Sequence, residues 1–358
     1  MQGGNVTNET TTTPPNMEHH EHEVPITLTA PGVLPVFIGG LGNQLWIFSA
    51  AYAVSQTLKC PLYLTRSPPM SRNAHLTRDV DYVEVLLRDV GEHIGRDITD
   101  VTFEGSRGAV LTPDHAFAAW SPPTENPDGA IVVMASYFQY YPAIAPYELD
   151  IRSLLLRNLQ PYMSTVRRVF ARKTGVDLSS CVFVHVRRGD YLHLSHIHFV
   201  QPVEYFATCL RLLGEKAEHA EPTEPTEPTH PFPPPFSPSP PPPHPTVVVV
   251  SDDPAWCKTQ VLFSGDRFVH GVDVFCPALC AEEDTNNLDE LHTLAIMASC
   301  LAGAVCANST FSWWGAFLGA HSAGSPVFVP KQWIASPHPE CLHPPQWIQV
   351  DPSVDPGV

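Results

Sequence analysis

Short apolar runs alternate with helical patterns along most of this chain. The predicted strands lie at residues 34–38, 61–65, 131–134, 181–186, 247–250, 272–275, 304–307 and 327–329. The predicted helices lie at residues 43–59, 154–169, 203–213, 288–300 and 311–320. Strands that alternate with helices form parallel sheets covered on both faces, so the pattern predicts an α/β fold with two such sheets. Ligands of these folds sit at the carboxyl ends of the strands.

Two low-complexity segments interrupt this alternation. Residues 1–32 are rich in Thr, Glu, His and Pro and predict a disordered tail. Residues 221–245 contain 13 prolines and predict an extended, disordered insert, because proline lacks the backbone N–H. The insert is either a tolerated surface insertion or a ligand for a proline-binding partner. The remainder divides into an N-terminal domain at 33–175, a C-terminal domain at 176–340 and a tail at 341–358.

The charge balance narrows the function. The sequence has 20 Lys and Arg against 37 Asp and Glu, a formal net charge of −17. This charge argues against a general nucleic-acid binder, which needs a basic face, but allows a local basic site for a small phosphate ligand. The longest apolar stretch, residues 294–306, is shorter than the about 20 residues of a membrane-spanning helix. The N-terminus matches neither a signal peptide nor a transit peptide.

The first motif runs from Gly39 to Asn43 and joins a predicted strand to a predicted helix. Glycines at such a turn let backbone N–H groups approach a phosphate, and the helix N-terminus favours negative charge. The spacing differs from the GxGxxG dinucleotide pattern. The motif is therefore either a tight turn or a ligand loop, in which Gly40, Gly42 and Asn43 are the candidate binding residues.

The second motif is His185-Val186-Arg187-Arg188-Gly189-Asp190, at the end of the predicted strand 181–186. Two arginines at a strand end suit a pyrophosphate, because their planar guanidinium groups bind phosphate oxygens in pairs. Asp190 is the one acidic residue that adjoins them in sequence. The alternative is a surface loop in which one arginine pairs with Asp190.

Two further motifs follow strands. In Ser251-Asp252-Asp253-Pro254, a carboxylate could accept two N–H bonds from a guanine edge, and the segment also suits a helix N-cap with proline at the first position. In the run from Asn308 to Ala316, hydroxyls at Ser309, Thr310 and Ser312 could cap a helix and contact phosphate. The adjoining Trp313 and Trp314 either pack in the core, which is the favoured interpretation, or stack on a sugar.

These motifs together resemble glycosyltransferase family 11. GGLGNQLWIFSAAYA, HVRRGDY, SDDPAWC and ANSTFSWWGAFLG occur here in the order typical of that family, and the chain looks like one of its α-1,2-fucosyltransferases. Tyr137-Phe138-Gln139 and the PKQW segment at 330–333 are smaller similarities. The resemblance covers about residues 35 to 335 and is interrupted by the proline-rich insert.

The resemblance implies a glycosyltransferase B fold, in which two Rossmann-like domains have parallel sheets that face a donor cleft. It implies an inverting enzyme that uses GDP-fucose, needs no metal or other cofactor, and transfers L-fucose to the 2-hydroxyl of a terminal β-galactoside. Arg187 and Asp190 would be catalytic. The donor would be bound by Gly40, Gly42, Asn43, His185, Arg187, Arg188, Asp252, Asp253, Ser309, Thr310 and Ser312. The partners would be GDP-fucose and a galactose-terminated glycan, without nucleic acid.

Some positions depart from the family pattern. Tyr140 replaces a serine, and Cys300-Leu301-Ala302-Gly303 replaces the family's CKHN stretch. A GDP-fucose-binding or lectin-like relic without turnover is therefore the alternative function, and a scaffold acting through the proline-rich insert is a third. Asp190, His193, His196 and His198 are all candidates for the general base. The family default of the Golgi and the mitochondrion are the candidate compartments.

Overall fold

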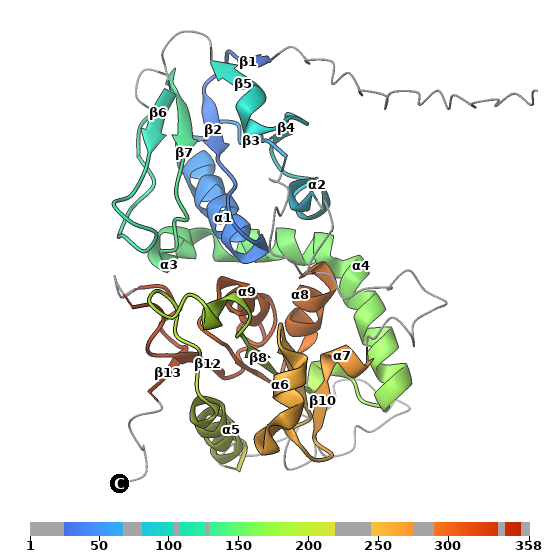
Figure 1. Ribbon diagram of the computed structural model, residues 1–358. Coiled ribbons are helices and arrows are strands. Elements are labelled where there is room, and N and C mark those ends of the chain that lie inside the picture. The colour runs from blue at the N-terminus through green and yellow to red at the C-terminus, as the bar shows by residue number, and fades with distance from the viewer. Residues whose placement is uncertain are drawn as a thin grey trace, which may run out of the picture.

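Figure 1 shows the computed structural model of the protein, which describes residues 25–66, 81–103, 108–126, 129–218, 245–274, 290–335 and 341–351. Residues 1–24 of the predicted tail and residues 221–244 of the proline-rich insert lie outside the described residues. None of the helices in the described part is both long enough and apolar enough to cross a membrane.

A six-stranded parallel sheet forms the C-terminal half of the molecule. Its strands are β8 (Val182–Val186), β9 (Val247–Ser251), β10 (Phe268–His270), β11 (Gly303–Val305), β12 (Val327–Pro330) and β13 (Ile348–Val350). They lie side by side in the order β10-β9-β8-β11-β12-β13. In chain order this is the 3-2-1-4-5-6 arrangement of doubly wound dinucleotide-binding sheets. The order reverses between β8 and β11, where a ligand crevice is expected.

Helices cover both faces of this sheet. The apolar strand β8 alternates its side chains, so that Val182, Val184 and Val186 pack in one cluster with α5 (Val203–Glu218). Phe183 faces the other side, in the main core with α4 (Glu148–Thr174), α8 (Glu290–Ser299) and α9 (Thr310–Leu318). Burial on both faces explains why the strand is continuously hydrophobic.

The N-terminal half contains a smaller parallel sheet. It is built from β2 (Gly32–Pro35), β7 (Ile131–Met134) and β6 (Gly108–Leu111), in that order. Around it lie β3 (Tyr63–Leu64), β4 (Glu92–His93), α2 (Tyr82–Leu86), and the pair β1 (Ile26–Leu28) and β5 (Val101–Phe103). Helix α1 (Leu41–Leu58) links β2 to β3, and a parallel bridge joins Val33 to Leu62. Residues 32–64 thus form a βαβ unit, and the predicted α/β fold with parallel sheets is confirmed.

One hydrophobic core runs through both halves. Trp46 on α1 is fully buried, and its ring lies 4.5 Å from that of Trp313 and 5.7 Å from that of Trp314, both on α9. The prediction that the two tryptophans of α9 belong to the core is therefore confirmed. Helix α4 extends from the N-terminal strands down one side of the six-stranded sheet (Figure 1). The halves thus share buried surface instead of meeting only at a linker.

Several segments differ from the sequence predictions, which place no element at residues 82–111, where α2, β4, β5 and β6 lie. The predicted strand at 272–275 is wrong: Gly271–Val274 is the short helix α7, and the strand is β10, four to five residues earlier. Backbone pairing of Phe268 with Val247 on β9 sets that register. Strands β1 and β13 lie within the segments predicted as tails. Each segment forms a strand because its backbone pairs with another strand, β1 with β5 and β13 with β12.

A polar network joins the two halves beside this core. Glu148, at the start of α4, accepts hydrogen bonds from Tyr141 (2.6 Å), Arg152 (2.9 Å) and His321 (2.9 Å). Tyr141 belongs to the short helix α3 (Tyr141–Ile144). The Nδ1 atom of His321 accepts a bond from the indole N–H of Trp347, so its Nε2 carries the proton donated to Glu148. The network ties α4 to the chain after α9 and to the segment before β13.

This network predicts a pH-dependent stability. Burial by itself would raise the pKa of Glu148, but the bonds from Tyr141 and His321 and the charge of Arg152 outweigh it and lower the pKa. A carboxyl whose pKa is lower in the folded state stabilises that state above its unfolded pKa of about 4.3, and the stabilisation disappears as the pH falls through the folded pKa. Glu148→Gln should therefore lower the Tm at pH 7, and the difference from wild type should shrink towards pH 3.

Thermal unfolding of both proteins between pH 7 and pH 3 tests this expectation. Glu204→Gln, which removes an exposed carboxylate from α5, is the control for the loss of one charge. A Tm difference for Glu148→Gln that stays constant or grows as the pH falls would contradict the assigned role of Glu148.

Candidate functional site

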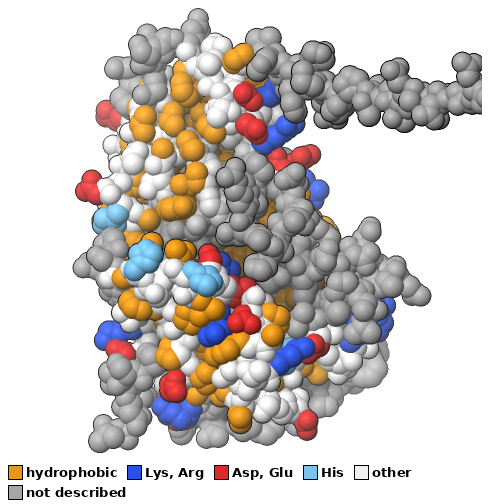
Figure 2. Space-filling model, in the orientation of Figure 1, with side chains coloured by type: hydrophobic (Ala, Val, Ile, Leu, Met, Phe, Trp, Pro, Cys, Tyr) orange, Lys and Arg blue, Asp and Glu red, His pale blue; other side chains and the backbone are white. Residues whose placement is uncertain are grey.

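The candidate site lies where the strand order of the six-stranded sheet reverses. His185 and Val186 end β8, and Arg187 and Arg188 follow directly. On one side β8 pairs with β9, which ends in Ser251 and continues into Asp252 and Asp253. On the other side β11 leads into the N-terminus of α9. In the view of Figure 2, acidic, basic and histidine side chains lie close together near the middle of the molecule.

Arg187 is held by two carboxylates. Its Nη2 donates to Asp190 Oδ1 at 2.7 Å, and its Nη1 lies 3.1 Å from Asp252 Oδ2. Its guanidinium also lies 5.2 Å from the centre of the Tyr191 ring. The side chain is 30% exposed, so the guanidinium is open to a ligand from one side. The pair with Asp190 is the one that the surface-loop interpretation anticipated.

Arg188 is held in a similar way on the β9 side. Its backbone N–H donates to Asp252 Oδ1 at 2.9 Å, and its Nε donates to Asp253 Oδ2 at 3.1 Å. The guanidinium stacks on Trp256, 3.9 Å from the ring centre, in a cation–π contact. Asp190 is the one acidic residue that adjoins the arginines in sequence, but in space two more carboxylates contact them. The pairing of β8 with β9 adds Asp252 and Asp253, so that three carboxylates face two guanidinium groups.

Both oxygens of each aspartate after β9 have a partner in this structure. Oδ1 of Asp252 accepts from the backbone N–H of Arg188, and its Oδ2 pairs with the guanidinium of Arg187. Asp253 pairs with Arg188 through Oδ2 and accepts from the backbone N–H of Trp256 through Oδ1. Asp253 is thus the N-cap of α6 (Pro254–Thr259), with Pro254 at the first position, which confirms the predicted cap. Each carboxylate accepts one contact per oxygen and is 25% or 29% exposed, so acceptor sites remain on both with which a guanine edge could be read.

His185 is buried and uncharged. Burial, with a smaller contribution from the charge of Arg187, lowers the pKa of its imidazole to about 3. At neutral pH it therefore contributes no positive charge to the site. Its ring lies 6.0 Å from Phe311 on α9, in an edge-to-face contact. His185 thus lies between the arginine segment and the start of α9.

The three hydroxyls at the start of α9 have different surroundings. Ser309 is the N-cap and accepts from the backbone N–H of Phe311, as predicted. Thr310 donates to Oδ1 of Asn43 at 2.9 Å. Ser312 is fully buried and donates to the backbone carbonyls of Ala307 and Ser309. In this structure only Ser309 and Thr310 lie close enough to the helix end to meet a phosphate together with its free N–H groups.

The glycine motif and the start of α9 lie against each other, although they are far apart in sequence. Gly40 is the N-cap of α1. A Cβ atom on Gly42 would lie 2.6 Å from the backbone nitrogen of Phe311 and 2.7 Å from the hydroxyl of Thr310. Only glycine allows this approach. The N-termini of α1 and α9 therefore come together, and each carries the partial positive charge of a helix end.

The histidines after the arginine motif are not equivalent. His193 and His196 are exposed, whereas His198 stacks on Tyr191 with ring centres 4.2 Å apart. Burial lowers the pKa of His198. Tyr191 itself is buried, which raises its pKa to about 12, and its hydroxyl donates to the backbone carbonyl of Asn308. Among the candidate bases, Asp190 is the one in direct contact with Arg187.

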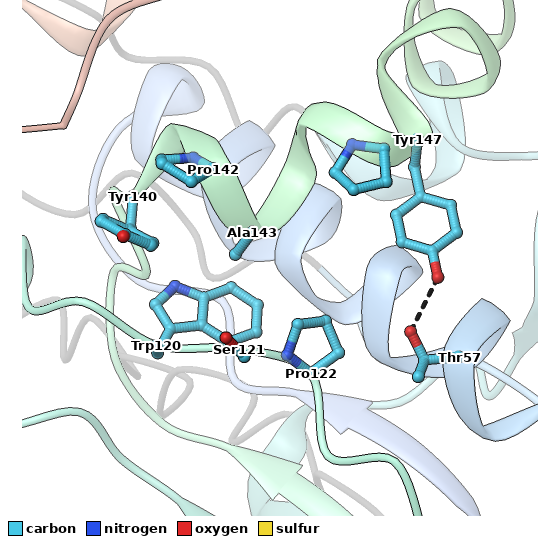
Figure 3. A pocket seen from close by; sticks show the side chains of 9 residues that line it. Thr57, Trp120, Ser121, Pro122, Tyr140, Pro142, Ala143 and Tyr147 are labelled. Atoms are coloured by element: carbon cyan, nitrogen blue, oxygen red, sulfur yellow. Dashed lines mark hydrogen bonds between the residues drawn. The ribbon is translucent and has the colours of Figure 1, made fainter.

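A separate cavity of about 290 Å³ lies in the N-terminal half (Figure 3). Its walls include Thr57, Trp120, Pro122, Tyr140, Pro146 and Tyr147. The hydroxyls of Thr57 and Tyr147 are joined by a hydrogen bond of 2.7 Å. Tyr140 directly follows Gln139, whose side chain donates to Asn43 of the glycine motif, but residues 39–43 do not themselves line the cavity.

The site contains three residues of the quoted motifs to which the sequence assigned no role. Tyr191 and Trp256 lie under the two guanidinium groups, and Gln139 donates to Asn43. Aromatic residues just after the HVRRGD and SDDP segments were a signal for the first two. Gln139 is distant in sequence from every other site residue, and only the contact with Asn43 shows its place.

A family comparison matches the part of the chain that begins just before β9 and includes α9. Residues 243–351 match the family described as Glycosyl transferase family 11. The O-antigen biosynthesis glycosyltransferase WbnK of Escherichia coli is 24% identical over 182 residues, which are 50% of this chain and 47% of that protein. The chain thus spans about half the length of the curated relative that it matches.

Two solved structures are also similar. The fucosyltransferase NodZ from Bradyrhizobium has a TM-score of 0.45 at 13% identity, over 81% of this chain and 94% of that one. POFUT1 in complex with GDP-fucose has a TM-score of 0.41 at 14% identity, over 84% and 98%. By the family match, the part of the chain that carries Asp252, Asp253 and the N-terminus of α9 is similar to glycosyltransferase family 11.

Proposed function

We propose that this protein is an inverting, metal-independent α-1,2-fucosyltransferase. It transfers L-fucose from GDP-fucose to the 2-hydroxyl of a terminal β-galactoside. The observation that carries the proposal is the position of Arg187, between two carboxylates at the switch point of a doubly wound sheet. The match of residues 243–351 to glycosyltransferase family 11 supports glycosyl transfer as the reaction class.

The diphosphate of the donor would bind between Arg187 and the N-terminus of α9. Its oxygens would replace Asp190 and Asp252 as the partners of Arg187. Because one anion replaces another, the new contacts would offset much of the free energy lost when the two ion pairs break. Backbone N–H groups at the start of α9 and α1 would add donors. These fixed positive groups could stabilise a departing diphosphate without a divalent ion.

Arg187 and Asp190 would act together in the chemical step. The acceptor 2-hydroxyl attacks the anomeric carbon of fucose from the face opposite GDP, a new C–O bond forms, and the bond to the diphosphate oxygen breaks. GDP leaves with the bonding electrons, and its added charge is met by Arg187. Asp190, released from Arg187 by the donor, would take the proton of the acceptor hydroxyl.

The acceptor would approach from the N-terminal half. We assign residues 33–175 to an acceptor-side domain and residues 176–340 to a donor domain of a glycosyltransferase B fold. The cavity beside Tyr140 supports the acceptor side, because aromatic and apolar walls can pack against sugar rings. A galactose-terminated glycan could extend into it from the glycine motif.

Transfer from labelled GDP-fucose tests the proposal. Lacto-N-biose and N-acetyllactosamine are the acceptors, EDTA is present throughout, and linkage analysis of the product identifies the hydroxyl used. We expect α-1,2-linked product in EDTA. Binding of GDP-fucose without transfer to any galactoside would favour the binding-only alternative, and the absence of both binding and transfer would overturn the proposal.

A further inference from the structure

The side-chain amide of Asn43 has a defined orientation. Its Oδ1 accepts two hydrogen bonds, from the hydroxyl of Thr310 at 2.9 Å and from Nε2 of Gln139 at 3.1 Å. A carbonyl oxygen has two lone pairs, so both are used. The Nδ2 group of Asn43 has no acceptor among the described residues. Its two N–H donors are thus available to a ligand.

The space beside this amide is kept open by glycine. Gly39 has a φ of +71°, in the left-handed region that favours glycine. A Cβ atom on Gly39 would lie 2.7 Å from Nδ2 of Asn43. Any larger residue would therefore crowd the donors. The glycine motif leaves the amide of Asn43 accessible in the first turn of α1, next to the N-terminus of α9.

Gln139 is itself held in place. It is 5% exposed, and its backbone N–H donates to the carbonyl of Ala116 at 2.7 Å. The preceding Phe138 has a φ of 52°, an unfavourable conformation for a bulky residue. Phe138 is fully buried, with its ring 5.3 Å from that of Trp120. The surrounding core thus holds a strained turn directly before Gln139, as is common next to functional sites.

The two partners of Asn43 differ in what they can determine. A hydroxyl either donates or accepts, so Thr310 could satisfy both orientations of the Asn43 amide. The Nε2 group of Gln139 can only donate. With its Nε2 facing Asn43, as in this structure, Gln139 selects the orientation in which Asn43 turns its oxygen towards Gln139 and its N–H groups away.

We propose that Gln139 is a positioning residue that holds the Asn43 amide with its N–H groups towards an anionic oxygen of the bound nucleoside diphosphate. The proposal rests on the function proposed above, because the ligand is the diphosphate of that donor. It assigns a role to the Tyr137-Phe138-Gln139 segment, which lies outside the four motifs. Gln139 would act only through Asn43, without touching the substrate.

Gln139→Glu tests the proposal, because a carboxylate of nearly the same shape can only accept. Asn43 would then turn its N–H groups towards the introduced carboxylate and its oxygen towards the phosphate. We expect the Kd for GDP, measured by calorimetry, to rise about tenfold or more, the loss of a hydrogen bond to a charged group. Gln139→Met, which removes the donor without imposing the reverse orientation, should raise the Kd less.

A double-mutant cycle separates positioning from a general effect of charge or folding. In an Asn43→Ala background, Gln139→Glu should leave the Kd for GDP unchanged, because the group that it acts through is gone. Gln160→Glu, on the exposed side of α4, is the control for an added negative charge. The Tm of each variant shows whether it is folded.

Each result decides the proposal. If wild type binds GDP and transfers fucose but Gln139→Glu and Gln139→Met bind GDP as wild type does, the role of Gln139 is overturned while the proposed function stands. An equal loss of affinity in the Asn43→Ala background would also overturn it. If wild type does not bind GDP, the proposed function fails and this inference fails with it.

Discussion

Arg187→Ala should reduce donor binding or fucose transfer by about 30-fold or more, equivalent to about 2 kcal/mol of lost charge-assisted contact. Arg187 is the residue at the end of β8 that meets both Asp190 and Asp252. Without its guanidinium the site retains three carboxylates but one arginine, Arg188. The net negative charge of the site would then repel the diphosphate of the donor. Calorimetry with GDP and initial rates with GDP-fucose measure the two parts of the effect.

Two further variants make this result specific. Arg187→Lys keeps the charge but cannot bind two oxygens with a planar group, and it should recover only part of the loss. Arg211→Ala removes an exposed arginine from α5, where its ion pair within the described part of the chain is with Glu215, and should leave binding and transfer unchanged. Activity of Arg187→Ala within threefold of wild type would remove Arg187 from the proposed mechanism.

Trp46→Ala should lower the stability of the whole protein by about 3–5 kcal/mol, as large-to-small changes of buried aromatic residues do. Trp46 is fully buried and packs across the junction between the halves, against Trp313 and Trp314 of α9. The truncation leaves a cavity between α1 and α9, and neither helix can move in to fill it while the sheets keep their positions. The expected fall in Tm is of the order of 10 °C.

This variant also reports on the site. Helix α1 begins beside Gly40 and carries Asn43, and its N-terminus lies against that of α9. Loosening the contact at Trp46 should therefore weaken GDP binding even at temperatures where the protein is folded. Leu149→Ala, at a position that is 68% exposed, is the control. A Tm of Trp46→Ala within about 2 °C of wild type would show that the two halves do not depend on a shared core.

Local sequence was sufficient for most of the secondary structure. The strands at 131–134, 181–186 and 247–250 and the helix from residue 43 were predictable, because continuous apolar runs and helical spacing reflect burial directly. The caps by Asp253 and Ser309 were predictable as well, since capping involves neighbours in sequence. The short strands β1 and β13 were not, because three-residue strands are specified by the edge that they pair with.

The same division applies to the candidate site. The sequence by itself determined which segments carry glycine, arginine, aspartate and serine at strand ends, and their order suggested one family. The tertiary structure alone decided which of these residues meet: Asp252 and Asp253 with the arginines, Thr310 with Asn43, and Gln139 with Asn43. The physical reason is that a parallel sheet brings together strand ends that are far apart in the chain. Pairings across that edge, including the carboxylates that neutralise the arginines, leave no trace in local spacing.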